Sequence, residues 1–428
     1  MGSLYISVST LFLMIFTASE LLFRGDSKTY WGDVKGLKEL KKGLDNGSVT
    51  PGSCLSSWVF SVDPCDYVFS DRFTCGFRCD LVVSGMNRVT GVSLDQAGYT
   101  GSLSSSACNY LPYLEILDLA YNSLSGSIPT SLSNLTRLRR LSLSGNSFSG
   151  EIPTSIGSLS ALEELYLDWN QLQGSIPASF KGLASLKRLE LQGNRISGEL
   201  PDLGSLKNLS FLDASDNAIS GGAPVGLPGS LVEIVMRNNS LEGNLSEKIK
   251  IRDLGFLQVM DLSHNRLSGA VPSIVFQHPS LQQLTLTHNR LSSIQVPRDR
   301  GARSELVALD LSYNELQGLL PAFMGIMPKL SALSMEKNKF TGMIPSQYAL
   351  KAAVPSEGTS PFARLLLGGN YLFGPIPGPL MALKPGSANV SLVDNCLFKC
   401  PETFFFCEGG VQKSSMDCKS FEPVIPRY

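Results

Sequence analysis

The chain has 428 residues, with 36 lysines and arginines against 37 aspartates and glutamates, so its formal net charge is −1. This balance disfavours nucleic acid or a polybasic contact with a membrane surface as the basis of binding. The length would ordinarily predict two or three globular domains, but the sequence repeats itself. Because each unit of a repeat array contacts only its neighbours, we expect one elongated domain.

Residues 1–27 are predicted to be a secretory signal peptide. The stretch from Leu4 to Phe23 is apolar and polar sequence follows it, although no basic segment precedes it and no single cleavage point stands out. The alternative is an N-terminal membrane anchor. That interpretation is disfavoured because Ser, Thr and Glu20 interrupt the apolar stretch.

Residues 28–86 are predicted to form an N-terminal cap. Apolar residues at helical spacing from Asp33 to Leu44, with lysines opposite, indicate a helix that covers the open end of the first coil. The density of cysteines that follows suits an oxidising compartment, and three disulfide pairings are possible. Zinc is disfavoured because the spacings are not those of paired Cys-x-x-Cys modules. These cysteines are Cys54, Cys65, Cys75 and Cys79.

Residues 87–395 are predicted to be about twelve copies of one repeat, seen most clearly from Leu114 to Arg137. Leucines alternate along a short strand, an asparagine follows it, and a Gly-x-Ile-Pro segment turns the chain back. The asparagine side chain can satisfy backbone groups of its own coil and of the next one. These ladder asparagines are Asn122, Asn146, Asn170, Asn194, Asn217, Asn239, Asn265, Asn289, Asn314, Asn338 and Asn370, with Ala97 in a degenerate first copy and Asn395 in a truncated last coil.

Two copies are irregular. The copy at Asn289 lacks the Gly-x-Ile-Pro half and brings Arg298, Arg300 and Arg303 into one loop, for which a solvated connection is the simpler explanation and a partner contact the alternative. The copy between Asn338 and Asn370 is expanded to 32 residues, and its insertion, residues 348–365, is the better candidate for a contact loop, again against an ordinary surface excursion.

Residues 396–428 are predicted to be a C-terminal cap and tail, in which Phe398 and Phe404 to Phe406 can cover the apolar end of the last coil. After Cys418 we expect neither a transmembrane helix nor a kinase domain. The ninth cysteine, Cys108, is expected to be an unpaired, buried and inert thiol. The disulfide candidates of this cap are Cys396, Cys400, Cys407 and Cys418.

The pattern LxxLxLxxNxLxGxIPxxLxxL resembles the plant-type leucine-rich repeat of extracellular receptors, receptor-like proteins and polygalacturonase inhibitors. The resemblance covers roughly residues 87–397, and the Gly-x-Ile-Pro half is its specific part. It implies an α/β-type solenoid, a superhelix with a parallel β-sheet on its concave face and disulfide-stabilised caps. The segment around Cys65 is similar to that family's N-terminal cap, with Tyr67 where the family usually has Trp.

The repeat register predicts which residues face the concave side, namely those four, two and one places before each ladder asparagine. Aromatic rings there offer anchors with little rotamer entropy, and carboxylates favour Arg or Lys on a partner, so a basic peptide or a basic patch on a protein is the expected ligand. Ordinary solubilising residues are the alternative. The candidate residues are Asp118, Tyr121, Tyr166, Asp168, Trp169, Glu190, Gln192, Asp213 and Asp216.

His264 and His288 occupy the same register position in consecutive copies, so we expect their side chains about 4.8 Å apart, one strand spacing. Close imidazoles resist double protonation, which would make binding sensitive to pH. Metal binding needs more ligands than the register supplies, so no metal site is expected. Plain surface histidines are the third interpretation.

Six Asn-x-Ser/Thr sequons are candidate glycosylation sites in an exported chain. A glycan on Asn238, one residue before a ladder asparagine, would obstruct the concave face, so either Asn238 is unoccupied or the ligand docks elsewhere. The sequons are Asn46, Asn134, Asn208, Asn238, Asn244 and Asn389.

Common hydrolase, metalloprotease, P-loop and dinucleotide motifs do not occur, so we expect neither catalysis nor a cofactor. The sequence predicts a secreted or cell-wall-associated recognition protein in plant extracellular signalling or defence, in the apoplast, the wall or at the periphery of the plasma membrane. Its expected partner is a protein or peptide, including a membrane receptor ectodomain. The resemblance gives a second hypothesis, an inhibitor of a secreted cell-wall-degrading enzyme of the polygalacturonase-inhibitor type. A structural role in the wall and an unrecognised hydrolase are the remaining classes, the latter disfavoured by the missing motifs.

Overall fold

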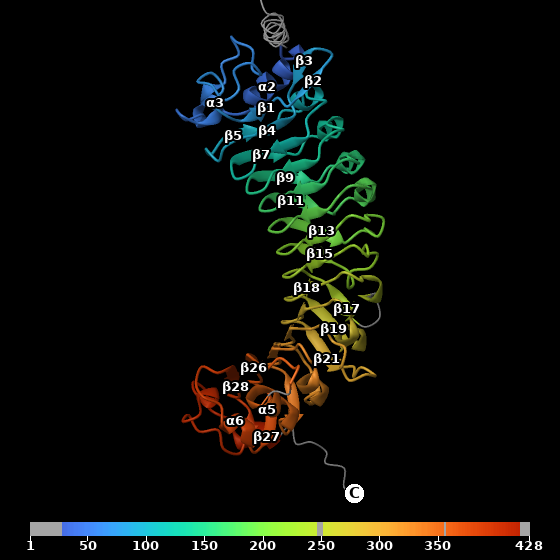
Figure 1. The fold of residues 1–428 in the computed structure, drawn as a ribbon, viewed down its shortest axis with the longest axis vertical. Helices are drawn as coiled ribbons and strands as arrows, with labels where there is room; N and C mark the ends of the chain where they lie inside the picture. Colours follow the sequence, from blue (N-terminus) through green and yellow to red (C-terminus); the bar gives the residue numbers. More distant parts are fainter. Residues whose placement is uncertain (1–27, 246–250, 355–356, 420–428) are drawn as a thin grey trace, which may run out of the picture. The chain divides into compact units, whose positions relative to one another are not determined.

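The computed structural model describes residues 28–245, 251–354 and 357–419. The predicted signal peptide and the last nine residues lie outside the described residues. The chain divides into two compact units, Met1–Phe148 and Ser149–Tyr428, and within each the coils follow one another in sequence order (Figure 1). In the part of the chain that the structure describes, no helix combines the length and hydropathy that a membrane span needs.

The N-terminal cap is built on helix α2 (Trp31–Gly43), two residues longer at its start than the sequence indicates. Leu37 and Leu40 are buried, as their spacing predicts. The Asp33 carboxylate is also buried and accepts hydrogen bonds from Arg88 Nε at 2.9 Å, Arg88 Nη2 at 2.7 Å and the Val89 N–H at 2.8 Å. This buried ion pair fixes the helix to the chain entering the first coil.

Two disulfides, Cys54–Cys75 and Cys65–Cys79, close the cap. Trp58 is buried beside them and donates its indole N–H to the Cys75 carbonyl at 2.8 Å. The smaller cap elements are the 3₁₀ helix η1 (Asn46–Ser48), α3 (Cys54–Ser57) and the hairpin of β2 (Leu81–Val83) and β3 (Met86–Arg88).

In the first unit, β1 (Phe77–Arg78) pairs antiparallel with β4 (Gly91–Ser93). Strands β4, β6 (Ile116–Asp118) and β8 (Arg140–Ser142) are then parallel. The other elements of its coils are β5 (Thr100–Ser102), β7 (Ser123–Ser127), η2 (Ala107–Asn109) and η3 (Thr130–Asn134), while β9 (Ser147–Glu151) runs across the boundary of the units.

In the second unit, ten parallel strands form one sheet, in which each strand pairs with the strand of the next coil without a register shift. Tyr166 is aligned with Glu190, and Glu190 with Asp213, so residues four places before successive ladder asparagines are neighbours. The strands are β10 (Glu164–Tyr166), β12 (Arg188–Glu190), β14 (Phe211–Asp213), β16 (Glu233–Val235), β18 (Val259–Asp261), β20 (Gln283–Thr285), β22 (Ala308–Asp310), β24 (Ala332–Ser334), β26 (Arg364–Leu366) and β28 (Asn389–Ser391).

Each coil of this unit returns through a second strand and, in most coils, a short helix. The return strands are β11 (Gln171–Gly174), β13 (Arg195–Glu199), β15 (Ala218–Ser220), β17 (Glu242–Asn244), β19 (Arg266–Val271), β21 (Arg290–Ile294), β23 (Gln317–Leu319), β25 (Lys339–Gly342), β27 (Tyr371–Gly374) and β29 (Cys396–Leu397). The helices are η4 (Thr154–Ser158), η5 (Ala178–Gly182), η6 (Ile251–Asp253), η7 (Ser273–Gln277), η8 (Ala322–Ile326), α5 (Ser346–Ala353), α6 (Gly378–Met381), η9 (Phe405–Cys407) and α7 (Ser415–Lys419).

The asparagine ladder holds neighbouring coils together. Asn265 donates its amide N–H groups to the carbonyls of Leu262 and Ser263 in its own coil and of Met236 in the preceding coil, at 3.0 to 3.1 Å, and accepts the Leu241 N–H at 2.9 Å. Each ladder asparagine thus forms hydrogen bonds with its own coil and the preceding coil, whereas the sequence predicted its own coil and the next one. The reason is that the side chain points back along the stack, toward the preceding coil.

Two described side chains of the insertion at residues 348–365 belong to the core. Tyr348 of α5 is fully buried and donates its hydroxyl to the Pro321 carbonyl at 3.0 Å. Lys351 is only 4% exposed and donates Nζ to the Met327 carbonyl at 2.7 Å. Burial lowers the pKa of Lys351 to about 8. A deletion that begins at Lys351 would therefore remove a buried polar contact along with the loop.

The C-terminal cap is closed by the disulfides Cys396–Cys418 and Cys400–Cys407. Phe406 is buried and its carbonyl accepts the Leu392 N–H at 2.8 Å, so this ring covers the end of the core. Phe398, which the sequence offered for the same purpose, is 75% exposed. Cys108 in the first unit is a free, buried cysteine.

Candidate functional site

The residue one place before each ladder asparagine has a left-handed backbone, and we call these residues the turn column. Their φ angles run from 51° to 71°, for glycines and for large side chains alike. Because a left-handed backbone redirects the side chain, these residues leave the alternation of the strand. The turn column comprises Tyr121 and Gly145 in the first unit, and Trp169, Gly193, Asp216, Asn238, His264, His288, Tyr313, Lys337, Gly369 and Asp394 in the second.

Three consecutive members of the turn column stack on one another. The rings of His264 and His288 lie 4.1 Å apart at an interplanar angle of 13°, and those of His288 and Tyr313 lie 4.2 Å apart at 13°. All three residues are exposed. The register thus places the two histidines together, and Tyr313 extends the stack by one coil. The same register rule also places Tyr313, which lies beyond the sixth copy, at a turn-column position.

Elsewhere in the turn column a large ring is followed by a glycine. A methyl group on Gly193 would lie 2.5 Å from Trp169 Cε3, and within the first unit a methyl group on Gly145 would lie 2.5 Å from Tyr121 Cδ1. The ring therefore lies over the next coil's glycine, with 57% of Trp169 and 55% of Tyr121 still exposed. Each unit presents a flat aromatic surface fixed by its own backbone.

Arginines that the sequence prediction omitted neutralise several of the predicted carboxylates. Glu190 accepts a hydrogen bond from Arg188, and Arg237 lies 3.7 Å from Asp216. Arg188 lies six places before a ladder asparagine. Because side chains alternate along a strand, this position is on the same face of the parallel sheet as the residues four places before the asparagine, and we call this face the strand face. In the first unit, Arg140 lies 3.9 Å from Asp118 from the same register position. The predicted acidic strip is a mosaic of both charges.

Asp168 is buried, with 3% exposure, so the prediction that it faces a ligand is wrong. It lies two places before its ladder asparagine, where the strand bends into the turn and neighbouring coils cover the side chain. Ser215, Ser263 and Ser312 hold the equivalent position and are also buried. Small side chains are therefore covered at this position. The long side chain of Arg237, at the equivalent position of another coil, extends beyond the cover and is exposed.

The other predicted strand residues are half-buried. Burial raises the pKa of Asp213, against the hydrogen bonds that it accepts from Ser215, and burial also raises the pKa of Glu233. Tyr166 donates its hydroxyl to Glu164 at 3.1 Å. Gln192 donates to Glu190 at 3.1 Å, while its buried Oε1 has no hydrogen-bond partner among the described residues. These groups form a polar floor beside the exposed Trp169.

Small side chains leave a shallow hollow in the sheet beyond the ring stack. Its volume is about 170 Å³, and its polar members include Asp310 and Arg364. Glu336 interacts with both, and burial and the charge of Asp310 raise its pKa against the opposing effects of Ser391, Lys337 and Arg364. The hollow is lined by Gln283, Leu284, Thr285, Ala308, Leu309, Asp310, Ala332, Ser334 and Arg364.

Five of the six sequon asparagines are exposed: Asn46, Asn134, Asn208, Asn238 and Asn389. Asn244 is half-buried, and its side chain lies over Gly269. Asn238 belongs to the turn column and donates to Asp216 at 2.8 Å, so a glycan there would project from the strand face. Cys54, Cys75 and Asp95 come close enough for a metal among the described residues, but the two sulfurs form a disulfide and carry no thiolate.

Comparison with known proteins places these coils in one repeat class. The family described as leucine rich repeat matches residues 89–148 and 152–196, and a second description of the same repeat matches residues 256–277. Lumican from Mus musculus is 41% identical over 93 residues, 22% of this chain and 27% of lumican. The chain thus spans about a quarter of the length of the first curated relatives that it matches.

Solved plant structures match over a longer stretch. The ectodomain of the membrane receptor kinase GASSHO1/SCHENGEN3 from Arabidopsis thaliana, solved in complex with CASPARIAN STRIP INTEGRITY FACTOR 2, is 30% identical with a TM-score of 0.62, covering 76% of this chain and 40% of that one. The plant peptide hormone receptor RGFR1, in complex with RGF2, is 29% identical with a TM-score of 0.59, covering 72% and 51%. With the repeat register, the parallel strands and the disulfide-closed caps, these matches show a leucine-rich repeat fold similar to the ectodomains of plant extracellular receptors.

Proposed function

We propose that this protein is a secreted or cell-wall-associated recognition protein that binds a peptide or protein ligand on its strand face, in plant extracellular signalling or defence. The observation that carries the proposal is the turn column of the second unit. It holds Trp169 and the stack of His264, His288 and Tyr313 exposed and in fixed orientations. Rigid rings lose little entropy when a ligand covers them, which is typical of binding anchors.

The chemistry of the strand face favours a ligand with planar side chains and mixed charge. The rings can stack on aromatic residues or on a guanidinium group. Glu190 and Asp216 already interact with arginines, so the attraction for a purely basic peptide is weaker than the acidic residues alone predict. In the hollow, Arg364 can pair with a carboxylate of the ligand and Asp310 with a cationic group. A short peptide of mixed charge meets these features better than a basic patch does.

The related receptors support a peptide as the ligand class. RGFR1 is described as a peptide hormone receptor, and the GASSHO1/SCHENGEN3 ectodomain was solved with a bound factor. Six candidate sequons and eight disulfide-bonded cysteines are in keeping with an exported protein.

The test is retention of ligands from plant extracellular fluid on the immobilised protein, read by mass spectrometry, followed by calorimetry with each purified ligand. The changes are Tyr166→Ala with Trp169→Ala, and His288→Ala with Tyr313→Ala. We expect at least one of these double variants to weaken the ligand about tenfold or more. A control double variant, Arg195→Ala with Arg266→Ala, removes exposed side chains from return strands and should leave binding unchanged.

Ligands that bind both strand-face variants as tightly as the original protein would contradict the proposal. Activity assays of fungal pectin-degrading enzymes with added protein address the alternative. Inhibition that disappears in the strand-face variants would favour an enzyme inhibitor over a peptide-binding protein.

A further inference from the structure

One coil of the second unit has an irregular segment where its neighbours have a helix. The preceding coil carries η7 and the following coil carries η8, but residues 295–304 have irregular backbone with turns at 298–303, and we call this segment the arginine loop. The cause lies in the sequence, because this copy lacks the Gly-x-Ile-Pro segment. It exposes the side chains of Arg298, Arg300 and Arg303.

Hydrogen bonds to Asp299 hold the arginine loop in place. Asp299 Oδ1 accepts the amide of Gln277 at 3.0 Å and the Gly301 N–H at 3.0 Å. Arg300 and Gly301 both have left-handed φ angles, 53° and 74°, and a methyl group on Gly301 would lie 2.8 Å from Met327 Cγ. A left-handed arginine is unfavourable by itself, so the surrounding contacts impose this backbone. The loop therefore presents its arginines from a defined position.

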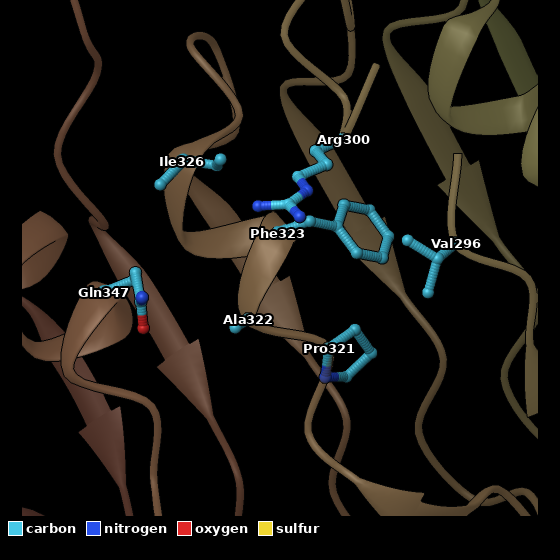
Figure 2. A pocket seen from close by; sticks show the side chains of 7 residues that line it. All are labelled: Val296, Arg300, Pro321, Ala322, Phe323, Ile326 and Gln347. Atoms are coloured by element: carbon cyan, nitrogen blue, oxygen red, sulfur yellow. The ribbon is translucent and has the colours of Figure 1, made fainter. Parts of the chain in front are cut away.

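Beside the loop lies a hollow of about 320 Å³ with a mainly apolar wall. Val296 is 63% exposed and Ile326 is 49% exposed, whereas Phe323 is 5% exposed and forms part of the wall. Figure 2 shows the Arg300 side chain with Ile326 on one side and the Phe323 ring and Val296 on the other. The site thus combines a cationic group with apolar side chains that remain partly open to solvent. Its lining residues are Val296, Arg300, Pro321, Ala322, Phe323, Ile326 and Gln347.

The positive charge of the loop is not used within the described part of the chain. No described carboxylate lies in ion-pair range of Arg298, Arg300 or Arg303. Asp299 uses one carboxylate oxygen on Gln277 and Gly301, and Glu305 accepts Lys329. A partner's carboxylate could therefore pair with a guanidinium without displacing an existing partner.

We propose that the arginine loop and its hollow bind an acidic segment of a partner protein, in which an aspartate or glutamate stands close to a bulky apolar residue. The carboxylate pairs with Arg300 and its neighbours, and the apolar side chain enters the hollow between Val296 and Ile326. A polysaccharide acid would satisfy the arginines but would leave the apolar wall unmatched, so a peptide segment fits better. This site is separate from the strand face, on which the arginine loop contributes no residue.

The test uses a displayed library of random linear peptides, selected on the full-length protein. The first variant replaces Arg298, Arg300 and Arg303 by Gln. The second carries Val296→Ser and Ile326→Ser. We expect selected peptides that pair Asp or Glu with a nearby Leu, Ile, Phe or Met, and a loss of affinity of about tenfold or more in either variant. The altered side chains are exposed, and thermal unfolding of each variant checks its fold.

Two controls make the result specific. Replacing Lys181, Arg195 and Arg266 by Gln removes the same charge from exposed positions outside the hollow, and should leave peptide affinity unchanged. Changing Trp169 and Tyr313 to Ala should also leave it unchanged, which separates this site from the proposed function.

Three outcomes would overturn the proposal. One is selection of peptides without the acidic and apolar pair. Another is equal binding to the arginine variant. The third is tight binding of polygalacturonate that needs the arginines but not Val296 and Ile326, with no peptide enriched, which would identify a site for acidic polysaccharide.

Discussion

The indole of Trp169 lies over Gly193 of the next coil, so closely that a methyl group on Gly193 would come within 2.5 Å of Trp169 Cε3. An exposed aromatic surface of this kind needs two residues in adjacent coils. The glycine supplies the space, and the left-handed backbone of both residues supplies the direction.

Replacing Gly193 by Ala tests this relationship. The φ angle of 68° disfavours a side chain, and the new methyl group must displace the indole. We expect the free energy of unfolding to fall by about 1–2 kcal/mol and the tryptophan emission to shift. Chemical denaturation with fluorescence detection measures both. Gly378→Ala is the control, since nothing lies within 4 Å of its added methyl group. Equal effects of the two changes would argue against the packing described.

The histidine stack predicts a pH dependence. Burial first, and then the charge of His264, lowers the pKa of His288, while Asp310 acts in the opposite sense. Burial also lowers the pKa of His278. In both cases the unfolded chain binds a proton more readily than the folded one. Stability is therefore highest above the ordinary histidine pKa of about 6.5 and falls as pH drops from there toward the lowered values.

Nuclear magnetic resonance titration resolves this prediction, because the chain has only three histidines. In His264→Ala the pKa of His288 should rise, since a like charge and a covering ring are both removed. The pKa of His278, which is buried elsewhere, should not change. A His288 pKa that stays constant in this variant would refute the coupling.

The asparagine ladder predicts a cost for losing one member. Asn370 is fully buried, accepts the Phe340 N–H at 3.1 Å and donates to the Met335 and Leu367 carbonyls at 2.9 and 3.0 Å. Asn370→Ala leaves these groups unpaired, and we expect a loss of about 1–3 kcal/mol in unfolding free energy. Urea denaturation measures it against Gln282→Ala, an exposed change expected to stay within about 0.5 kcal/mol. Comparable stability of the two variants would contradict the ladder.

Cys108 should be unreactive in the folded protein. It is buried, and burial raises its pKa to about 11, so little thiolate is present near neutral pH. A disulfide reagent such as Ellman's should label almost no thiol at pH 8, and one thiol per chain after unfolding without reductant. Rapid stoichiometric labelling of the folded protein would show that the thiol is accessible.

The sequence predicts the coil well because its local rules are strict. The ladder positions follow from Asn122 onward, and the stacking of His264 on His288 follows from the same register. The parallel strands follow too, since each coil brings the next strand back beside the last. These are properties of one repeat and its neighbour.

What the sequence did not predict depends on side-chain contacts that the register rule does not describe. Asp168 was assigned to the exposed face, although neighbouring coils bury its position. The pairing of Arg188 with Glu190 does not follow from a rule that uses only the positions four, two and one places before the ladder asparagine. The buried Lys351 could not be recognised from an insertion whose only visible feature was its length.

The arginine loop illustrates the same limit. Its irregular sequence indicated either a solvated connection or a partner contact, and nothing in the sequence placed Val296 and Ile326 beside one hollow. Those two residues come from successive coils. Only the stacking of the coils brings them together.

The left-handed turn column also limits how such a protein can change. Tyr121 lies against Gly145, and His288 lies between the rings of His264 and Tyr313, so the side-chain size that fits at one position depends on the adjacent coil. Duplicating, deleting or exchanging a single coil would keep the pattern of leucines and asparagines. It would also place a turn-column ring against a side chain of the next coil that does not fit it. The smallest unit that can be transplanted with its surface intact is consequently a pair of coils, and grafts designed to transfer binding between such proteins should be cut between matched pairs.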